Sequence, residues 1–382
     1  METADAVIIG GGLIGTSIAY QLGKRLNKVV LIEKAEIGGQ TSGSCDKAIF
    51  LQSKKPGFPI KLAKASRNMF AHLEEELGMS FEFKPSGGMI IIESEKYKPF
   101  MESFVANQRK AGMEIEMLDR KQALEQQPYL SPEIEGSTFC SEDAEVNPMR
   151  LTQAFAHGAE GENVDIRTYT AVTDVFTNHG KVTGVDTTKG PISTDLVINA
   201  AGPFASNIAE MVGVQLPIEP RRGAILITER VKPILYGSML SSQYIAAKHV
   251  VDDHEMPPYG VGLSLGQTES GNILIGGSRE FVGFDKKIPM KVVEAIAEHA
   301  EIIAPNLGDV KIIRTMAGFR PFTGDGLPII DETPEVKGFI IAAGHEGDGI
   351  ALSPITGKLV TDLVAGKENA LLHPLKLNRF TD

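Results

Sequence analysis

One arginine stands in a stretch that otherwise indicates a buried strand and a tight turn. The stretch MAGFRPFTGDGLPII (316–330) places Arg320 among glycines, prolines and apolar residues, with Asp325 and Asp331 as nearby acids. Removing a guanidinium from water is costly unless an anion meets it. Arg320 therefore either forms an internal salt bridge with one of these acids or holds an anionic ligand in a bidentate geometry.

The first forty residues contain the spacing of a dinucleotide-binding turn. Gly10, Gly12 and Gly15 form G-x-G-x-x-G between an apolar run at 6–9 and a helical pattern of apolar residues. The first glycine allows the turn, the second lets backbone approach a pyrophosphate, and the third lets helix and strand pack closely. Glu33 ends the next apolar run, where a carboxylate binds an adenosine ribose and disfavours the 2′-phosphate of NADP. The motif indicates a dinucleotide but does not distinguish FAD from NAD.

Three later stretches favour FAD. A second small-residue loop, KAEIGGQTSGSCDKAIF, follows Glu33, and VINAAGPFA (197–205) is another strand that ends in small residues. The third stretch, GFIIAAGHEGDGIALSPITGKLVTDLVAGK, predicts a buried strand, a glycine-rich bend and a helix that begins near Ser353 and Pro354. The N-terminus of such a helix carries about half a positive charge, which suits the flavin edge that becomes anionic on reduction. The alternative is a plain strand, turn and helix that only complete the fold.

The composition of the chain argues against several classes of protein. The chain has 382 residues, enough for two domains, and 38 basic against 49 acidic residues give a net charge of −11. This balance, without a basic stripe, argues against a nucleic-acid partner. Two cysteines, Cys45 and Cys140, are too few for a disulfide framework or an iron–sulfur cluster. With no leader-like start and no apolar run of about 20 residues, we expect a cytoplasmic protein without a transmembrane segment.

Taken together, these motifs resemble the D-amino-acid oxidase superfamily of FAD enzymes, in the branch of glycine oxidase, sarcosine oxidase and proline or hydroxyproline dehydrogenase subunits. VIIGGGLIG, GGQTSG, VINAAGPFA, MAGFRPFTGDGLPII and AAGHEGDGIALSPITG occur in the family order over nearly the whole chain. The resemblance implies an α/β fold, with a discontinuous Rossmann-like FAD domain (1–80, 143–215 and 310–382). It also implies an interleaved α+β substrate domain on a mostly antiparallel sheet (81–142 and 216–309).

The same resemblance implies a set of cofactor contacts and a dissociable, non-covalent FAD, because the GHEGDG bend lacks the cysteine that some relatives use for covalent attachment. The expected contacts are Gly10, Gly12, Leu13, Ile14, Gly15, Glu33, Lys34, Thr41, Ser42, Val172, Ala200, Ala201, Gly202, Gly318, Gly344, Glu346, Gly347, Asp348, Gly349 and Ile350. No metal site is expected.

In this family an arginine in an A-G-x-R-P stretch binds the substrate carboxylate above the flavin, and Ala317–Pro321 is the matching stretch. Arg320 is therefore the predicted carboxylate clamp. Relatives often add a tyrosine from a substrate-domain strand, but the matching strand here has none. Tyr244 and Tyr259 lie upstream, and packing or surface roles are the simpler expectation for both.

Two further residues are predicted near the flavin. His345 either contacts flavin or substrate or satisfies loop backbone, and the pattern does not choose between these roles. Lys47 either lies over the flavin or projects to a partner surface, with the second favoured. Cys45 is a possible reactive thiol, although an inert buried cysteine is the simpler expectation.

The resemblance implies oxidation of a C–N bond in a small amino or imino acid (glycine, sarcosine, a D-amino acid or a proline-like compound) by hydride transfer to flavin N5. O2 is one possible acceptor. The alternatives are a catalytic subunit of a hetero-oligomeric hydroxyproline, proline or opine dehydrogenase that passes electrons to an FMN or iron–sulfur partner, and a non-catalytic flavin-binding subunit. A homo-oligomer is also possible. The substrate and its chirality stay open.

Overall fold

The computed structural model describes residues 2–249 and 257–380. Its centre is a six-stranded sheet with the order β19-β20-β13-β2-β3-β9, in which every neighbouring pair is parallel except β19 with β20. Short runs of Val, Ile and Ala form these strands because both faces of the sheet are covered. The bounds are β2 (Ala6–Ile9), β3 (Val29–Ile32), β9 (Asp165–Arg167), β13 (Val197–Asn199), β19 (Ile329–Glu332) and β20 (Phe339–Ala343).

Alternate residues of this sheet contribute to two different cores. Ile8 and Leu31 belong to a core on the helical face, whereas Val7 and Val30 pack into a core on the other face. The helical face is covered by α1 (Leu13–Gly23), α6 (Pro148–Gly161) and α10 (Gly349–Val364), with α2 (Phe58–Met69) and α3 (Leu73–Leu77) beyond them.

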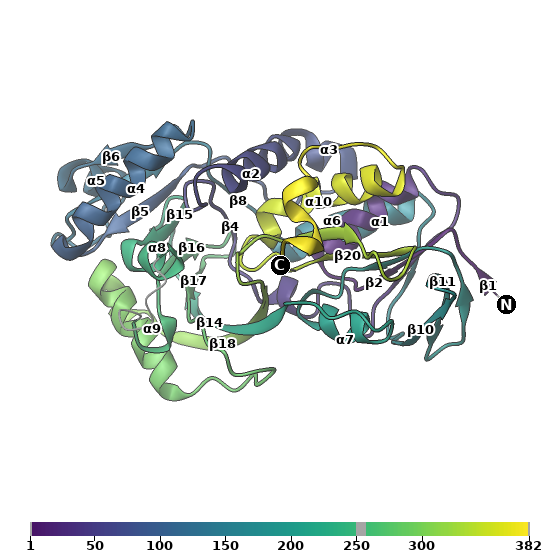
Figure 1. The fold of residues 1–382 in the computed structure, drawn as a ribbon. Coiled ribbons are helices and arrows are strands. Elements are labelled where there is room, and N and C mark those ends of the chain that lie inside the picture. The colour runs from purple at the N-terminus through teal and green to yellow at the C-terminus, as the bar shows by residue number, and fades with distance from the viewer. Residues whose placement is uncertain (1, 250–256, 381–382) are drawn as a thin grey trace.

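On the other face lie α7 (Ala205–Glu210) and a four-stranded sheet with the order β1-β12-β11-β10 (Figure 1). The expected turn at Asn178–Gly180 joins β10 to β11, with His179 (φ +50°) and Gly180 (φ +72°) in left-handed conformations. The strands are β1 (Glu2–Thr3), β10 (Val172–Asn178), β11 (Lys181–Thr187) and β12 (Ile192–Ser193).

A second large sheet has eight strands in the order β18-β14-β17-β16-β15-β5-β7-β6, and all its pairs are antiparallel except β15 with β5. The predicted α/β fold with a mostly antiparallel second sheet is therefore confirmed. The strands are β5 (Gly88–Ile92), β6 (Glu116–Leu118), β7 (Gly136–Cys140), β14 (Glu219–Arg230), β15 (Ser238–Ser241), β16 (Ser264–Gln267), β17 (Asn272–Gly276) and β18 (Ile312–Phe322); β4 (Ala48–Ile49) and β8 (Ala144–Glu145) form a separate pair.

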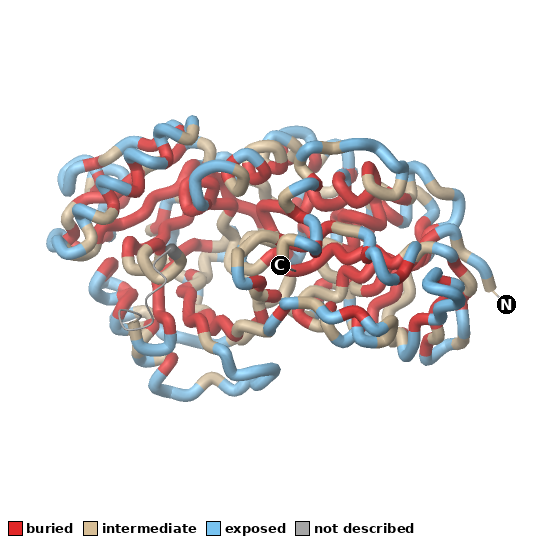
Figure 2. Tube along the Cα trace, in the orientation of Figure 1, coloured by how far each residue is buried: buried red, intermediate tan, exposed pale blue. Residues whose placement is uncertain are grey.

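Helix α9 (Met290–Ile303) packs against β14 and β17 and closes a third core around Leu226, Ile273 and Ile296. The remaining helices are α4 (Lys98–Lys110), α5 (Arg120–Gln126) and α8 (Ser242–His249). Figure 2 shows the strands of both large sheets mostly buried, with the exposed segments at the periphery. No helix in the described ranges is long and apolar enough to cross a bilayer.

Two boundaries differ from the sequence-based expectation. Residues 312–322 lie in a segment expected for the FAD domain, yet as β18 they pair with β14 in the eight-stranded sheet. The predicted helix start at Ser353 is wrong, because α10 begins one turn earlier at Gly349 and has Pro354 inside it. Proline offers no N–H to the carbonyl four residues before it. The Ser353 hydroxyl donates to that carbonyl, Ile350 O, instead (3.0 Å), so the helix continues through the proline.

Candidate active site

A cavity of about 230 Å³ lies where the carboxyl ends of β2, β13 and β20 meet β14 and β18 of the other sheet. Crevices outside the carboxyl ends of parallel strands are the usual ligand sites of such sheets. Its walls come from segments that are far apart in the chain: 9–14, 32–46, 170–172, 200–208 and 342–350 on one side, and Gly223, Ile225, Tyr244, Gly318, Arg320 and Pro321 on the other.

The glycine turn after β2 leaves no room for side chains. Gly10 has φ +113°, and a Cβ there would lie 2.6 Å from Ala200 O. A Cβ on Gly15 would lie 1.8 Å from Gly10 O, so Gly15 is needed for packing and does not line the cavity. Gly12 lines the cavity immediately before α1. This exposed backbone at a helix N-terminus suits a pyrophosphate.

Glu33 lies at the end of β3 with only 8% of its surface exposed. Its two carboxylate oxygens accept from Gly11 N (2.7 Å) and Ala35 N (2.8 Å). Each oxygen keeps a second lone pair, so the carboxylate can still accept bonds from ribose hydroxyls but repels a 2′-phosphate. The glycine turn, the acid and the small-residue walls together fit FAD.

Most of the predicted cofactor contacts meet at this cavity. Gly15, Gly344 and Asp348 do not line it. Gly344 (φ +84°) forms a turn in which a Cβ would clash with Thr323 Cγ2 at 2.6 Å. The predicted contacts that do line the cavity are Gly10, Gly12, Leu13, Ile14, Glu33, Lys34, Thr41, Ser42, Val172, Ala200, Ala201, Gly202, Gly318, Glu346, Gly347, Gly349 and Ile350.

Arg320 also lines the cavity. It lies near the end of strand β18, and its side chain is half-buried. Its Nη1 donates to Ser278 O at 3.0 Å. Space for the guanidinium comes from Gly223 on β14, where a Cβ would lie 2.2 Å from Nη1. The strand geometry therefore holds this cation at the cavity wall.

Both acids that could neutralise Arg320 are occupied elsewhere. Asp325 pairs with Arg379 (2.7 Å), and Asp331 accepts from Leu377 N (3.0 Å). Among the described residues no carboxylate forms an ion pair with Arg320. The internal salt bridge considered from the sequence is thus not formed with either acid.

Two other arginines share the face of the sheet that carries Arg320. Arg221 is the register partner of Arg320 on β14, whereas the neighbouring Arg222 bridges to Glu280 on the opposite face. Arg279 precedes Glu280 and so points back to the face of Arg221 and Arg320. Arg221 forms an ion pair with Glu346, and burial beside Arg279 and Arg320 lowers the pKa of Arg221 to about 9. The sequence argument singled out neither Arg221 nor Arg279.

Tyr244 lines the cavity and Tyr259 does not. Tyr244 comes from helix α8 rather than from a strand, which is why a search for a tyrosine in a strand did not single it out. The Arg279 guanidinium lies 3.9 Å from the centroid of its ring. Burial opposes ionisation of the phenol, but Arg279, Lys248 and Arg320 outweigh burial and lower its pKa. Tyr259 is 39% exposed.

His345 lines the cavity and is 3% exposed, with Nε2 3.0 Å from Thr356 Oγ1 on α10. Burial lowers its pKa to about 3, so the imidazole is neutral at physiological pH. A neutral ring held by Thr356 can offer one donor or one acceptor to the cavity.

Lys47 is placed away from the cavity wall. Its Nζ lies 3.0 Å from Glu145 and donates to Gln267 O (2.6 Å), and its side chain is only 12% exposed. The ammonium group is thus held inside the protein, and the role of Lys47 stays a prediction. Cys45 lines the cavity, but burial, with Asp46 second, raises its pKa to about 12, so the thiol is not activated.

Asp348 sits at the N-cap of α10 and binds two lysines that the sequence argument did not connect to it. Lys54 Nζ lies 2.6 Å and Lys248 Nζ 3.3 Å from the same carboxylate oxygen. Burial opposes ionisation of Asp348, but the two lysines lower its pKa well below the usual range. The acid thus ties the bend after β20 to α8 and to the loop after β4. No group of His, Cys, Asp and Glu in the described ranges is arranged to hold a metal ion.

Comparisons with known proteins agree with this geometry. A family model described as DAO, FAD dependent oxidoreductase, matches residues 5–363. The chain is 30% identical to hydrogen cyanide synthase subunit HcnC of Pseudomonas protegens, over 98% of this chain and 95% of that protein. It is likewise 30% identical to glycine oxidase of Geobacillus kaustophilus, over 98% and 97% of the two chains.

Solved structures give the same result. The crystal structure of the Geobacillus glycine oxidase superposes with a TM-score of 0.89 at 27% identity and covers 100% of both chains. That of L-proline dehydrogenase from P. horikoshii has a TM-score of 0.88 at 27% identity, covering 99% of this chain and 98% of the other.

Proposed function

This chain belongs to the DAO family of FAD-dependent oxidoreductases, and from that premise we propose that it oxidises the C–N bond of a small amino or imino acid whose carboxylate is bound by Arg320. The observation that carries the proposal is the state of this side chain. Arg320 is half-buried at the cavity wall, has no ion-pair partner among the described residues, and both nearby acids are bound elsewhere.

The cofactor would lie along the walls formed by 9–14, 32–46, 170–172, 200–208 and 342–350. The backbone at Gly10 and Gly12 would hold its pyrophosphate, and Glu33 its ribose. FAD, when bound, supplies the electron-accepting ring for the oxidation. The cofactor would thus be held by three segments of the chain, 1–80, 143–215 and 323–382. The eight-stranded sheet, now including β18, holds the substrate.

Arg320 would fix both the position and the tilt of the substrate. Two parallel N–H donors match a carboxylate, which the point charge of a lysine does not do. Fixing the carboxylate leaves the α-carbon one bond away in a constant orientation, and this positioning supplies much of the rate enhancement. His345 and Tyr244 are two further polar side chains that line the same cavity.

The cations around the cavity would also set the protonation state of the substrate amine. Arg320, Arg279 and Lys248 raise the local positive potential, which disfavours an ammonium group and favours the neutral amine. The neutral amine donates its lone pair as hydride leaves the carbon for the flavin, which leaves an iminium ion. Water then hydrolyses the iminium ion to an oxo-acid and ammonium or a protonated amine, so no dedicated protein base is required.

The electron acceptor divides the proposal into two forms. O2 would make the chain a self-sufficient oxidase. A partner protein would make it a dehydrogenase subunit, which is favoured by the similarity to a protein that is itself named as a subunit. A non-catalytic, flavin-binding subunit is the remaining alternative, and a free clamp such as Arg320 argues against it.

Anaerobic mixing of the purified holoprotein with single compounds tests the proposal. The panel is glycine, sarcosine, D-alanine, D- and L-proline, the hydroxyproline epimers and opines. We expect at least one compound to bleach the visible flavin band, whatever the acceptor. If no amino or imino acid bleaches the flavin band, the proposed function is refuted. Steady H2O2 formation in air identifies the oxidase, whereas turnover only with an artificial acceptor identifies the dehydrogenase.

A further inference from the structure

Arg320 lines the cavity, and four further cations lie near it. Arg221 is paired with Glu346, and Lys54 and Lys248 share the single carboxylate of Asp348. Arg279 and Arg320 form no ion pair with any acid in the described part of the chain. Asp46 also lines the cavity, but it accepts from Ser264 Oγ (2.8 Å) and is paired with neither arginine.

Arg279 is the less expected of the two free cations. Only 8% of the residue is exposed, and its Nε and Nη1 have no hydrogen-bond partner among the described residues. Its stacking on Tyr244 satisfies the flat face of the guanidinium but not these two N–H groups. A buried cation with unsatisfied donors destabilises the empty protein, so an anionic ligand is the group that would satisfy it.

Arg279 does not line the cavity itself, and its link to the cavity is its stacking contact with Tyr244. The tyrosine lines the wall that also carries Arg320, and the Arg279 guanidinium lies 3.9 Å from the centroid of its ring. Arg320 Nη1 donates to the carbonyl of Ser278, so the Arg320 guanidinium contacts the backbone immediately before Arg279. An anion that accepts from the Tyr244 hydroxyl therefore also meets the field of Arg279.

We propose that Tyr244 and Arg279 form a second anion subsite beside Arg320, and that the preferred substrate is a dicarboxylic amino or imino acid. This inference rests on the proposed function. One carboxylate would be bound by Arg320. The second, on the side chain or on the nitrogen substituent, would accept a hydrogen bond from Tyr244 and neutralise Arg279. A monocarboxylic substrate would leave Arg279 buried with no counter-ion from the described residues.

Matched substrate pairs test the proposal with the holoenzyme. Sarcosine and iminodiacetate differ by one carboxylate, as do D-alanine and D-aspartate, and L-alanine and L-aspartate. We expect the acidic member of at least one pair to have a kcat/KM about 10- to 100-fold higher, the range for a hydrogen bond to a buried charged group. If the monocarboxylic member is equal or better in every pair that reacts, the subsite is refuted while the oxidase function stands.

Binding without turnover separates this outcome from failure of the function itself. Acetate, succinate and glutarate are titrated into the holoprotein and followed by perturbation of the flavin spectrum. A dicarboxylate is expected to bind at least about 10-fold more tightly than acetate. This preference would be measurable even if no amino acid reduced the flavin. Equal affinity for acetate and both dicarboxylates would overturn the proposal.

Arg279→Met tests the residue. The change should abolish the preference for dicarboxylates in both assays and should not lower Tm, because it removes a buried cation that has no acid partner among the described residues. Arg279→Lys should restore part of the preference. Arg314→Met, an exposed arginine on the same strand as Arg320, is the matched control and should leave the preference unchanged. A fall in Tm for Arg279→Met with the preference intact would show a purely structural role.

Discussion

At the scale of single residues, the site depends on charges that the protein leaves uncompensated. Most buried cations here have acids of their own: Arg222 has Glu280, Lys47 has Glu145, and Lys54 has Asp348. Arg320 and Arg279 stand apart from that rule within the described residues. Free charges of this kind are kept where a ligand supplies the counter-charge, since they add nothing to stability on their own.

Replacing Arg320 separates geometry from charge. Arg320→Met should lower kcat/KM by about 10²- to 10³-fold, because two charge-assisted hydrogen bonds to the carboxylate are lost. Arg320→Lys keeps the positive charge but not the two parallel N–H donors, and should lower kcat/KM roughly 10-fold. Steady-state kinetics with the substrate identified by flavin bleaching provide the measurement. Unchanged kcat/KM in Arg320→Met would remove the carboxylate clamp from the scheme, provided that FAD content matches the wild type.

His345 should make the folded protein sensitive to acid. Its pKa of about 3 lies below the value near 6.5 of an unfolded histidine, so the unfolded state binds more protons between these pH values. Stability therefore falls as pH drops below about 6.5, by roughly 2 kcal/mol at pH 5 from this residue. Denaturant unfolding at saturating FAD should show a shallower loss between pH 7 and 5 for His345→Asn.

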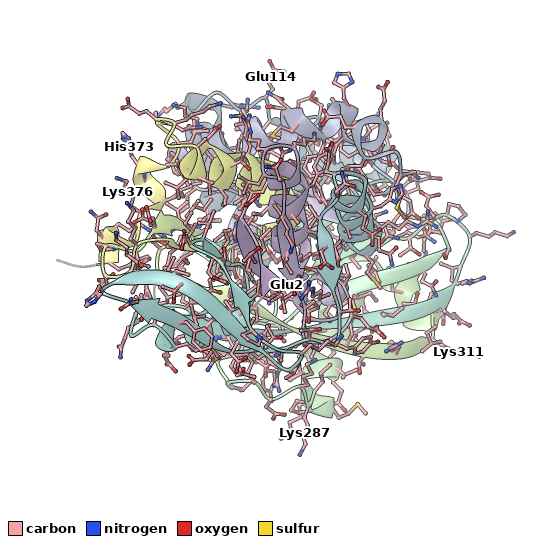
Figure 3. All side chains as sticks on the ribbon, turned by 90° about the vertical axis from the view of Figure 1, so that its right-hand side faces the viewer. Glu2, Glu114, Lys287, Lys311, His373 and Lys376 are labelled. Carbon is pink, nitrogen blue, oxygen red and sulfur yellow. The ribbon has the colours of Figure 1, made fainter. Side chains whose placement is uncertain are left out.

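His373 provides the control for that experiment because it is exposed at the surface and labelled in Figure 3. His373→Asn should show the wild-type slope. An identical slope in the wild type and in His345→Asn would mean that the imidazole is not held neutral by burial.

At the scale of elements, the strands and turns around the cofactor were predictable and the substrate side was not. The strand at 6–9, the glycine turn and the acid at 33 follow from local periodicity and from conformations that only glycine tolerates. Tyr244 and Arg279 acquire their positions from α8 and from the strand pairing around β17, which are tertiary features. The early start of α10 was missed because a serine hydroxyl compensates for the proline, an interaction with no periodic signature.

The glycine turn offers a test at this scale. Gly10→Ala would place a Cβ 2.6 Å from Ala200 O at φ +113°. The backbone conformation alone should cost about 1–3 kcal/mol, and the displaced turn should weaken FAD binding. We expect a lower Tm and FAD released on dilution, measured by flavin fluorescence. Gly190→Ala is the control, since Gly190 also has positive φ but lies in a hairpin turn with nothing within 4 Å of its Cβ. Equal FAD retention in both variants would contradict the proposed pyrophosphate site.

At the scale of the whole molecule, separate segments are joined by a few buried polar groups. On the surface, Lys287, Lys311 and Lys376 project at well-separated places in Figure 3. Inside, the Asp348 carboxylate joins Lys54, in the loop after β4, to Lys248 on α8, so three segments far apart in the sequence meet at one acid.

Asp348→Asn should therefore affect the assembly of the whole molecule. The change leaves two buried lysines with no acid and should lower the free energy of unfolding by about 3–5 kcal/mol. Glu36→Gln is the control, because it makes the same change from carboxylate to amide at an exposed position. Urea unfolding at pH 7 with saturating FAD gives the values. A loss below about 1 kcal/mol would show that the lysines reach other anions or water.

The walls of the cofactor cavity come from segments spread along the chain, and 342–350 is the last of these segments to be synthesised. During translation, a ribosome-bound chain can form the glycine turn long before the residues that form the opposite wall of the cavity have been synthesised. The nucleotide crevice is therefore incomplete until 342–350 has emerged from the ribosome. A chain truncated before that segment should be colourless even though its amino-terminal fingerprint is intact.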